Sequence, residues 1–187
     1  MIQFQRMTTE YLALDDRIRV SGETKSQEII VLWLTQRLLL RLLPHLLEWL
    51  EKQTLAEIGP ANTDNQAKEM LQEFAQQSAR DELTGMAPVK PVRAELTVNA
   101  SVKESNDTKG ILVESVDIKK VNQTIQLVFK NPDKTQVGIL MTAQQMRQWL
   151  AIIREHWQKA SWPLSIWPKW ISKSAPTDSI KAGQEFH

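Results

Sequence analysis

Hydrophobic and polar residues alternate along much of this chain, and the period changes at several points from two residues to three or four. Residues 2–14 form an irregular extended run, and in the segment 17–21 Ile18 and Val20 alternate with arginines. Such alternation gives a strand one buried and one solvent-facing side. The chain is therefore predicted to open with strands, which a polar turn at residues 22–26 ends.

Residues 28–34 permit two interpretations. Thr24 and Gln27 have the spacing of a capping box, which would open one very long helix. The run itself is short, unbroken and rich in β-branched residues, as in a strand buried on both faces. The internal correspondence described below favours the strand, with Thr35 as the cap of the helix that follows.

A Leu-rich helix is predicted at about residues 36–52. It is apolar nearly all round, and its polar residues form one narrow stripe, made of Arg37, Arg41, His45, Glu48 and Lys52. A helix of this kind is usually buried on more than one side, in its own core or against a partner. Pro44 removes one backbone hydrogen bond, so we expect a kink or a break there.

A second helix is predicted after a connector that contains Gly59 and Pro60. Thr63 and Gln66 have capping-box spacing, and the helix is expected to end near Gly85. Its apolar residues lie on one face in an ordinary amphipathic pattern: Ala67, Met70, Leu71, Phe74, Ala75 and Leu83. The two prolines that follow predict an extended linker up to residue 93.

The second half of the chain is predicted to be an antiparallel meander followed by a helix. The expected strands are residues 94–103, 111–121, 124–130 and 135–141, and short polar turns between them indicate hairpins. Thr142 and Gln145 form a capping box. The helix after it has a single apolar stripe, made of Ala143, Met146, Trp149, Leu150, Ile153, Trp157 and Ala160.

The segment 161–171 is rich in tryptophan but is interrupted by Pro163 and Pro168, so it is predicted to be neither a long helix nor a regular strand. Tryptophan buries a large area and is enriched in binding hot spots. The segment is therefore a candidate binding element, although folding back over the chain's own sheet is the favoured interpretation. Residues 172–187 are polar and aperiodic, and we expect them to be disordered.

An internal correspondence links the two halves. Residues 11–52 align without gaps with residues 118–159, at a constant offset of 107 positions that matches Thr35 with Thr142. The order of strands, turns, threonine and helix recurs, but few residues are identical. Chance is one explanation, because meanders followed by capped helices are common. A duplication would place two units about a pseudo-two-fold axis or join their sheets edge to edge.

The predicted fold class is α+β, with two antiparallel β-meander-plus-helix units joined by an amphipathic helix and a proline-containing linker. The first unit covers residues 1–56, and the connecting helix and linker cover residues 57–93. The second unit, with the Trp-rich segment, covers residues 94–171, and the tail covers residues 172–187. Together they are expected to form one compact domain.

Composition narrows the classes of function. The 187 residues include 23 Lys and Arg against 22 Asp and Glu, so no global field attracts nucleic acid or anionic membranes. The chain has no cysteine, which excludes disulfides, thiolate nucleophiles and cysteine zinc sites. The N-terminus lacks a signal-peptide pattern, and residues 29–50 contain too many charges to span a membrane. A cytoplasmic location is therefore expected.

No pattern of residues predicts catalysis. The histidines are scattered, at His45, His156 and His187, and the adjacent Glu155 and His156 diverge on a helix. Motifs for phosphate loops, nucleotides, zinc and nucleophile elbows are absent. We expect no cofactor and lean away from an enzyme.

A metal site would require the fold to bring distant aspartates together. Asp15 and Asp16 would have to meet Asp117, but the first two occupy a predicted hairpin turn, and turn chemistry already explains them. No metal is therefore expected.

The leading hypothesis is a non-catalytic protein-protein interaction or assembly module that uses the Leu-rich helix and the Trp-rich segment to bind a protein partner or a second copy of itself. Its candidate partner-binding residues are Arg37, Arg41, Trp49, Trp162, Trp167 and Trp170. Arg37 and Arg41 lie one helical turn apart and could grip a phosphate or carboxylate, or form a solvated stripe paired with Glu48.

Three further classes of function are compatible with the sequence. One is nucleic-acid binding through the lysines of the second meander: Lys103, Lys109, Lys119, Lys120, Lys130 and Lys134. Exposed strands carry lysines in any case, and Phe129 is almost the only aromatic residue there for stacking on bases. The second class is a small-ligand-binding or enzymatic domain without a recognisable motif, and the third is attachment to a membrane surface.

Overall fold

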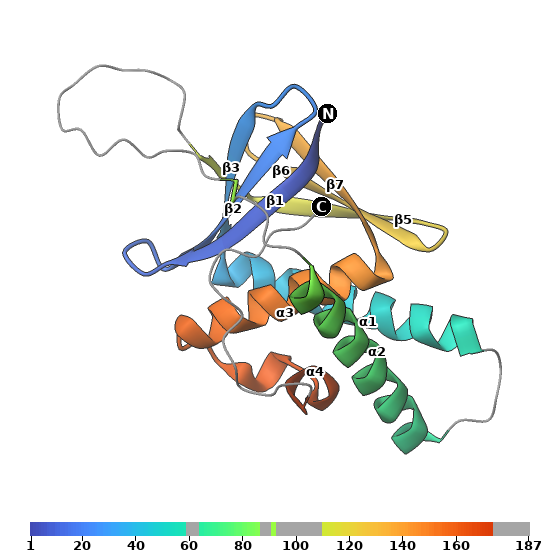
Figure 1. Ribbon diagram of the computed structural model, residues 1–187. Coiled ribbons are helices and arrows are strands. Elements are labelled where there is room, and N and C mark those ends of the chain that lie inside the picture. The colour runs from blue at the N-terminus through green and yellow to red at the C-terminus, as the bar shows by residue number, and fades with distance from the viewer. Residues whose placement is uncertain (59–63, 87–90, 93–109, 174–187) are drawn as a thin grey trace, which may run out of the picture.

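The computed structural model describes residues 1–58, 64–86, 91–92 and 110–173 of the chain (Figure 1). This part is a mixed α+β fold, with one curled seven-stranded sheet and four α-helices. The predicted fold class is confirmed at this level. The strand expected at residues 94–103 lies outside the described residues.

The sheet contains two antiparallel meanders. The first consists of β1 (Ile2–Leu12), β2 (Arg17–Thr24) and β3 (Ile29–Thr35). The second consists of β5 (Ser115–Val121), β6 (Thr124–Lys130) and β7 (Gln136–Thr142), with the short β4 (Ile111–Leu112) before it. Residues 29–35 are thus a strand and not the start of a long helix, which confirms that prediction.

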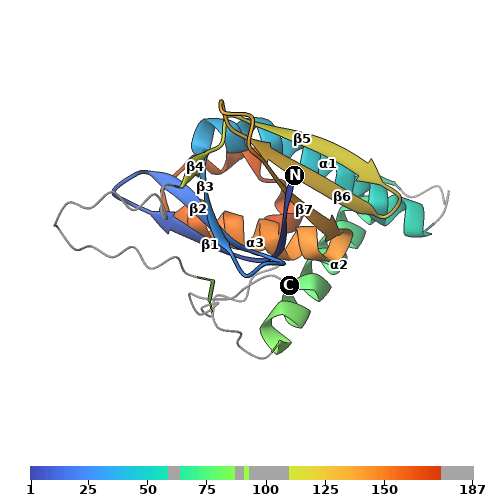
Figure 2. The same cartoon turned by 90° about the horizontal axis from the view of Figure 1, so that it is seen from above.

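The two meanders form one sheet in the order β4-β3-β2-β1-β7-β6-β5. Strands β1 and β7 pair in parallel at its middle. Strands β4 and β5 lie at opposite ends of this order, yet only Val113 and Glu114 separate them in sequence. The Val113 amide donates to the carbonyl of Trp33 on β3, next to β4, at 3.1 Å. The Glu114 amide donates to the carbonyl of Lys130 on β6 at 2.9 Å. The sheet therefore curls until its two ends meet at these residues (Figure 2).

The helices gather beside the curled sheet (Figure 1). They are α1 (Gln36–Ile58), α2 (Asn65–Gly85), α3 (Ala143–Lys159) and α4 (Lys169–Lys173), with a short 3₁₀ turn at Leu164–Ile166. Helix α1 contacts β3, and α3 contacts β1 and β7. Helix α2 packs on α1, α3 and α4. Most of α2 therefore has other helices, and not the sheet, as its neighbours.

Side chains at the ends of the third strands start α1 and α3. The Thr35 hydroxyl accepts a hydrogen bond from the Leu38 amide at 3.2 Å. Thr142 and Gln145 form the predicted capping box. These bonds satisfy amides that have no partner inside the helix, which fixes where each helix begins.

Helix α1 continues through Pro44 and ends at Ile58, beyond the predicted end near residue 52. A kink or a break was expected at Pro44, and the break does not occur. Pro44 and Leu40 are both exposed. The Leu40 carbonyl, which loses its amide partner at Pro44, therefore lies on the solvent side of the helix, where water can replace that bond.

The core of the fold forms around α1. The buried apolar residues of α1 are Leu38, Leu39, Leu42, Leu43, Leu46, Leu47, Trp49 and Leu50. They belong to one cluster with the inward side chains of the sheet and with α3. The Leu-rich helix is thus buried in the core of its own chain. Among the described residues, no helix has the length and the unbroken apolar character needed to cross a membrane.

Candidate functional site

The tryptophans of the Trp-rich segment are buried against the rest of the fold. Trp162, Trp167 and Trp170 all belong to the core cluster. Trp157 of α3 makes edge-to-face contacts with Trp162 and Trp167, with ring centroids 4.9 Å and 5.7 Å apart. Tyr11 adds a third such contact with Trp162, at 5.9 Å. The segment therefore covers its own core and exposes little indole surface to a partner.

Two of these indoles have polar partners inside the chain. Trp162 Nε1 donates to Asp16 Oδ1 at 3.0 Å, and Trp170 Nε1 donates to Glu51 Oε1 at 3.3 Å. Trp49 is 1% exposed and lies in the core of α1. All four candidate tryptophans are thus buried within their own chain, and Trp162 holds the turn that contains Asp16.

Arg37 and Arg41 remain exposed on α1, one turn apart. Glu48, which the sequence offered as their partner, instead binds Lys52 at 2.5 Å. Neither arginine lines any of the three cavities described below. They are accessible at the surface of α1.

Of the candidate lysines that the structure describes, one forms an ion pair and others are exposed. Lys130 pairs with Asp117 at 2.5 Å, and Lys119 and Lys120 are exposed on β5. Lys103 and Lys109 lie outside the described residues. Within the part of the chain that the structure describes, no group of three or more histidines, aspartates or glutamates could hold a metal ion.

The unexpected feature of the helical layer is the orientation of α2. Met70 is 63% exposed and Phe74 is 75% exposed, whereas Gln72, Gln76 and Arg80 are buried. An amphipathic helix normally turns its apolar stripe toward the core. In α2 the two largest residues of that stripe, Met70 and Phe74, face solvent, whereas Leu71 and Ala75 are half-buried and Leu83 is buried.

Hydrogen bonds hold the polar side of α2 against α1 and α3. Arg147 of α3 is only 3% exposed and donates to Thr54 Oγ1 at 2.7 Å and to Gln72 Oε1. Its guanidinium carbon lies 5.2 Å from the centre of the Trp170 ring, a cation–π arrangement. Gln76 Nε2 donates to the Arg147 carbonyl at 3.1 Å. These bonds compensate the burial of amide and guanidinium groups, which would otherwise cost stability.

A groove runs along α2 beside this polar contact. Its volume is about 430 Å³. Helix α2 lines it with Leu71, Phe74, Ala75, Ser78 and Ala79, and the walls come from Gln53 and Thr54 of α1 and from Ala143, Gln144 and Arg147 of α3. Exposed apolar side chains thus border a concave surface, a combination that is typical of binding sites for protein side chains.

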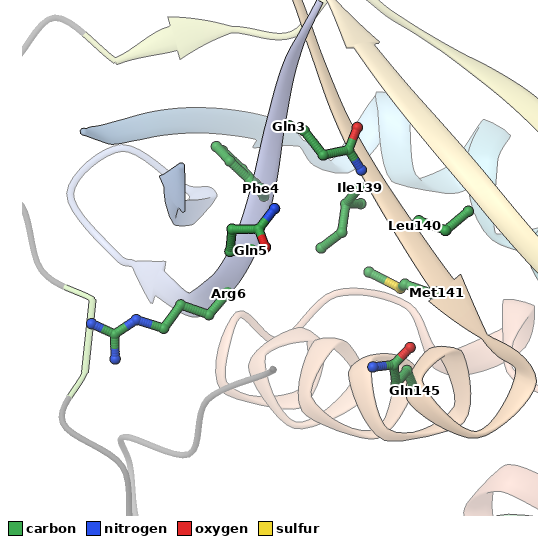
Figure 3. A pocket seen from close by; sticks show the side chains of 8 residues that line it. All are labelled: Gln3, Phe4, Gln5, Arg6, Ile139, Leu140, Met141 and Gln145. Atoms are coloured by element: carbon green, nitrogen blue, oxygen red, sulfur yellow. The ribbon is translucent and has the colours of Figure 1, made fainter. Parts of the chain in front are cut away.

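A second cavity lies where β1 and β7 diverge, and its volume is about 380 Å³ (Figure 3). These strands pair only at Ile2–Gln3 of β1 and at the facing residues of β7. The polar side chains in its lining are Gln3, Gln5, Arg6 and Gln145. Arg6 forms an ion pair with Glu23. The lining offers amides and one paired guanidinium, with no carboxylate or imidazole to transfer a proton.

The third cavity, of about 450 Å³, lies among α1, α2 and α4. Glu51, Glu69, Lys68, Lys169 and Trp170 contribute to its lining. Both charge signs occur together there, so the lining shows no preference for a cation or an anion.

The titratable groups with the clearest environmental effects lie away from these cavities. Burial lowers the pKa of His156, whose Nε2 lies 2.8 Å from the Thr9 carbonyl and therefore donates to it. Burial also raises the pKa of Glu155 and lowers the pKa of Arg80 and Arg154. None of the four lines any of the three cavities. Their shifted pKa values reflect packing between α2, α3 and β1.

Comparison with protein-family models, with curated proteins and with solved structures gives no match for this chain.

The residues that form the groove are not among the candidates that the sequence provides. The sequence pattern places Met70, Leu71 and Phe74 on the apolar face of an ordinary amphipathic helix. The signal that could have identified them lies in the polar residues on the other side of the same helix, because Gln72, Gln76 and Arg80 also recur at helical spacing. The sequence shows two stripes on α2, and only the structure shows which one faces inward.

Proposed function

We propose that the protein is a non-catalytic interaction or assembly module that docks a protein chain through the outward stripe of α2. We call this stripe, made of Met70, Leu71, Phe74 and Ala75, the α2 apolar face. The observation that carries the proposal is the orientation of α2, which buries hydrogen-bonded polar groups and leaves Met70 63% and Phe74 75% exposed. Single exposed apolar residues are common on protein surfaces, but a stripe beside a groove is typical of an interface.

In this proposal the Leu-rich helix and the Trp-rich segment do not bind the partner themselves but hold the docking surface in place. The α1 leucines form the core on which α2 rests, and Trp170 of α4 lies against Arg147, which binds α2. A rigidly held helix loses little conformational entropy when a partner binds, which favours affinity. The candidate tryptophans would then act by holding the docking surface in place.

We also infer that the two meander-plus-helix units arose by internal duplication. Strands β2 and β3 and helix α1 begin at Arg17, Ile29 and Gln36, and their counterparts β6, β7 and α3 begin at positions 124, 136 and 143. Each pair differs by the same 107 positions. This agreement of the element boundaries supports the inference.

The parallel strand pairs give the duplication independent support. Ile2 of β1 lies opposite Val137 of β7, and Ile111 of β4 lies opposite Leu32 of β3. Adding 107 to residue 2 and subtracting 107 from residue 137 gives positions 109 and 30. These two positions differ by 79, as do residues 111 and 32 of the second pair, so the two pairs have the same register. Both contacts between the units would therefore obey one pseudo-two-fold relation.

Helix α2 lies outside the corresponding segments. The aligned ranges are residues 11–52 and 118–159, and α2 occupies Asn65–Gly85 between them. Each unit has its own helix after its third strand, so neither needs α2 to complete the pattern. An added helix with its apolar stripe outward is suited to binding.

The test is a comparison of Phe74→Glu with Leu14→Glu in the full-length protein. Leu14 is an exposed apolar residue in the β1–β2 turn, so both changes place a carboxylate at an accessible apolar position. Each should alter the free energy of unfolding by about 0.5 kcal/mol or less. We expect Phe74→Glu to abolish the protein associations of the purified chain, measured by light scattering and by reconstitution with co-purified proteins, whereas Leu14→Glu retains them. Equal association by both variants would overturn the proposal.

A further inference from the structure

We infer that the cavity between β1 and β7 binds a small, uncharged, planar heterocycle of the nucleobase class. This site goes beyond the proposed function, because its lining shares no residue with the α2 apolar face or with the groove beside it. The inference is carried by a comparison within the molecule, between the two places where strands of the two meanders pair in parallel.

The two parallel strand pairs can be compared position by position. They have the same register, so each residue of one pair has a counterpart 107 positions away in the other. Trp33 of β3 pairs with Leu112 of β4. The counterparts of these residues are Leu140 of β7 and Gln5 of β1, but the pairing of β1 with β7 stops before them. Leu140 and Gln5 line the cavity instead. The cavity thus opens at the positions where β3 and β4 are paired.

An aromatic ring covers the β3–β4 pair. The Trp33 indole lies over Gly110, where an added Cβ atom would be 2.0 Å from the indole Nε1. The counterparts of Trp33 and Gly110 are Leu140 and Gln3, and both line the cavity. Leu140 has no ring and is 50% exposed. The β1–β7 pair therefore lacks the planar group that covers its counterpart, and the ring of a ligand can take that place.

Polar side chains border the cavity where the other strand pair has apolar residues. Arg6 corresponds to Val113, which is 3% exposed, and Gln145 of α3 corresponds to Leu38 of α1, which is 8% exposed. Such buried apolar residues close the β3–β4 side, whereas polar residues leave the β1–β7 side open to a polar ligand. Together the polar lining residues are Gln3, Gln5, Arg6 and Gln145 (Figure 3).

The chemistry of the lining favours an uncharged ligand that has both hydrogen-bond donors and acceptors. Each glutamine amide can donate and accept, and the ion pair with Glu23 offsets the charge of Arg6. Phe4, Ile139 and Met141 add apolar surface to the same lining. A nucleobase combines a flat face for apolar contacts with an edge of amide-like donors and acceptors, so it matches both parts of the lining.

The size of the cavity suits a single ring system. Its volume of about 380 Å³ lies within the range of about 300–1,000 Å³ that is usual for small-molecule sites. The β1–β7 pair lies at one end of the opening, and Gln145 in the first turn of α3 lies at the other (Figure 3). The lining residues of β7 are Ile139–Met141, which span about 10 Å at about 3.3 Å per residue. A base or a nucleoside fits this length better than an extended chain.

The experiment measures the binding of adenosine, guanosine, cytidine and uridine to the full-length protein by ligand-observed NMR and calorimetric titration. Indole serves as a planar ring without the amide-like edge. We expect at least one nucleoside to bind with a dissociation constant of about 1 mM or lower, and indole to bind about tenfold more weakly. Gln5→Leu, which introduces the residue type of Leu112 at an exposed position, should weaken nucleoside binding by about fivefold.

The double variant Gln3→Gly with Leu140→Trp reproduces the residues of the β3–β4 pair and should fill the cavity with an indole. We expect it to weaken nucleoside binding by about tenfold or more, because the ring would occupy the ligand's place. Leu164→Trp is the matched control, since Leu164 is 47% exposed and lies outside the cavity. It should bind nucleosides as the wild type does. Circular dichroism verifies that each variant is folded.

Three results would overturn the inference. The first is that none of the four nucleosides binds the wild-type protein at concentrations up to about 10 mM. The second is that indole binds as tightly as every nucleoside, because the polar lining then selects nothing. The third is that the folded double variant and Gln5→Leu both bind as the wild type does, which would place the nucleoside elsewhere. If the double variant does not fold, Gln5→Leu alone decides this last point.

Discussion

Gly22 allows β1 and β2 to pack around an aromatic ring. The two strands pair with a register shift between Phe4 and Arg6, which redirects Phe4 over β2. A Cβ atom at Gly22 would lie 2.2 Å from the Phe4 ring. Phe4 is buried in the core, so its ring has little space into which to move.

Replacement of Gly22 by alanine should therefore destabilise the protein. We expect Gly22→Ala to lower the free energy of unfolding by about 1–3 kcal/mol, because overpacking forces a buried side chain out of its preferred position. Chemical denaturation monitored by tryptophan fluorescence would measure the change.

Gly85 offers the matched control, because nothing lies within 4 Å of a Cβ atom placed there. Since Gly85 ends α2, Gly85→Ala should leave stability unchanged or raise it by up to about 1 kcal/mol through helix propensity. Similar losses in both variants would show that the Phe4 contact does not limit the space at Gly22.

At the scale of single elements, local patterns predicted most strands and helix starts, because these depend on neighbours in sequence. The strand at residues 29–35 and the caps at Thr35 and Thr142 are examples. The cap of α2 differs from its prediction, since Asp64 Oδ1 accepts from the Ala67 amide at 2.7 Å. The orientation of α2 could not be predicted, because periodicity identifies an apolar face without showing what that face contacts.

Arg147 should control how firmly α2 is held. Arg147→Met keeps an unbranched apolar side chain but removes the hydrogen bonds to Thr54 and Gln72. We expect the free energy of unfolding to fall by about 3 kcal/mol, because a hydrogen bond to a charged group contributes about 1.5–3 kcal/mol and two such bonds are lost, although Thr54 and Gln72 keep their 3.3 Å bond to each other. Amide hydrogen exchange should rise across α2 more than in the central strands.

Arg41→Met is the control for the loss of a positive charge, because Arg41 is exposed on α1. Its effect should remain within about 0.5 kcal/mol. If Arg147→Met unfolds at the same denaturant concentration as Arg41→Met, the hydrogen bonds of Arg147 do not anchor α2.

At the scale of the whole molecule, contacts between segments distant in sequence decide the topology. The two meanders were predictable from their hairpins, but the parallel pairing of β1 with β7 was not, because no local pattern specifies it. The strand expected over residues 111–121 is divided into β4 and β5, which belong to opposite ends of the sheet. Val113 is buried and Glu114 is exposed there, and their amides bond to different strands.

Substitutions at Glu114 test how much this junction contributes to the stability of the sheet. Glu114→Pro removes the amide that donates to the Lys130 carbonyl, whereas Glu114→Ala keeps the amide and loses only an exposed side chain. We expect the proline variant to lose about 1–2 kcal/mol of unfolding free energy, in line with a lost hydrogen bond and a partly desolvated carbonyl. The alanine variant should stay within about 0.5 kcal/mol of the wild type.

Hydrogen exchange distinguishes closure of the sheet from a local effect. The Val113 amide bonds to Trp33 on β3, and the Glu114 amide bonds to Lys130 on β6. Loosening this junction should therefore raise hydrogen exchange at both ends of the sheet, in β3 as well as in β6. Faster exchange in β6 alone would mean that the two ends are held independently. In that case the curled sheet would depend on its helices, and not on the β4–β5 junction, to keep its ends together.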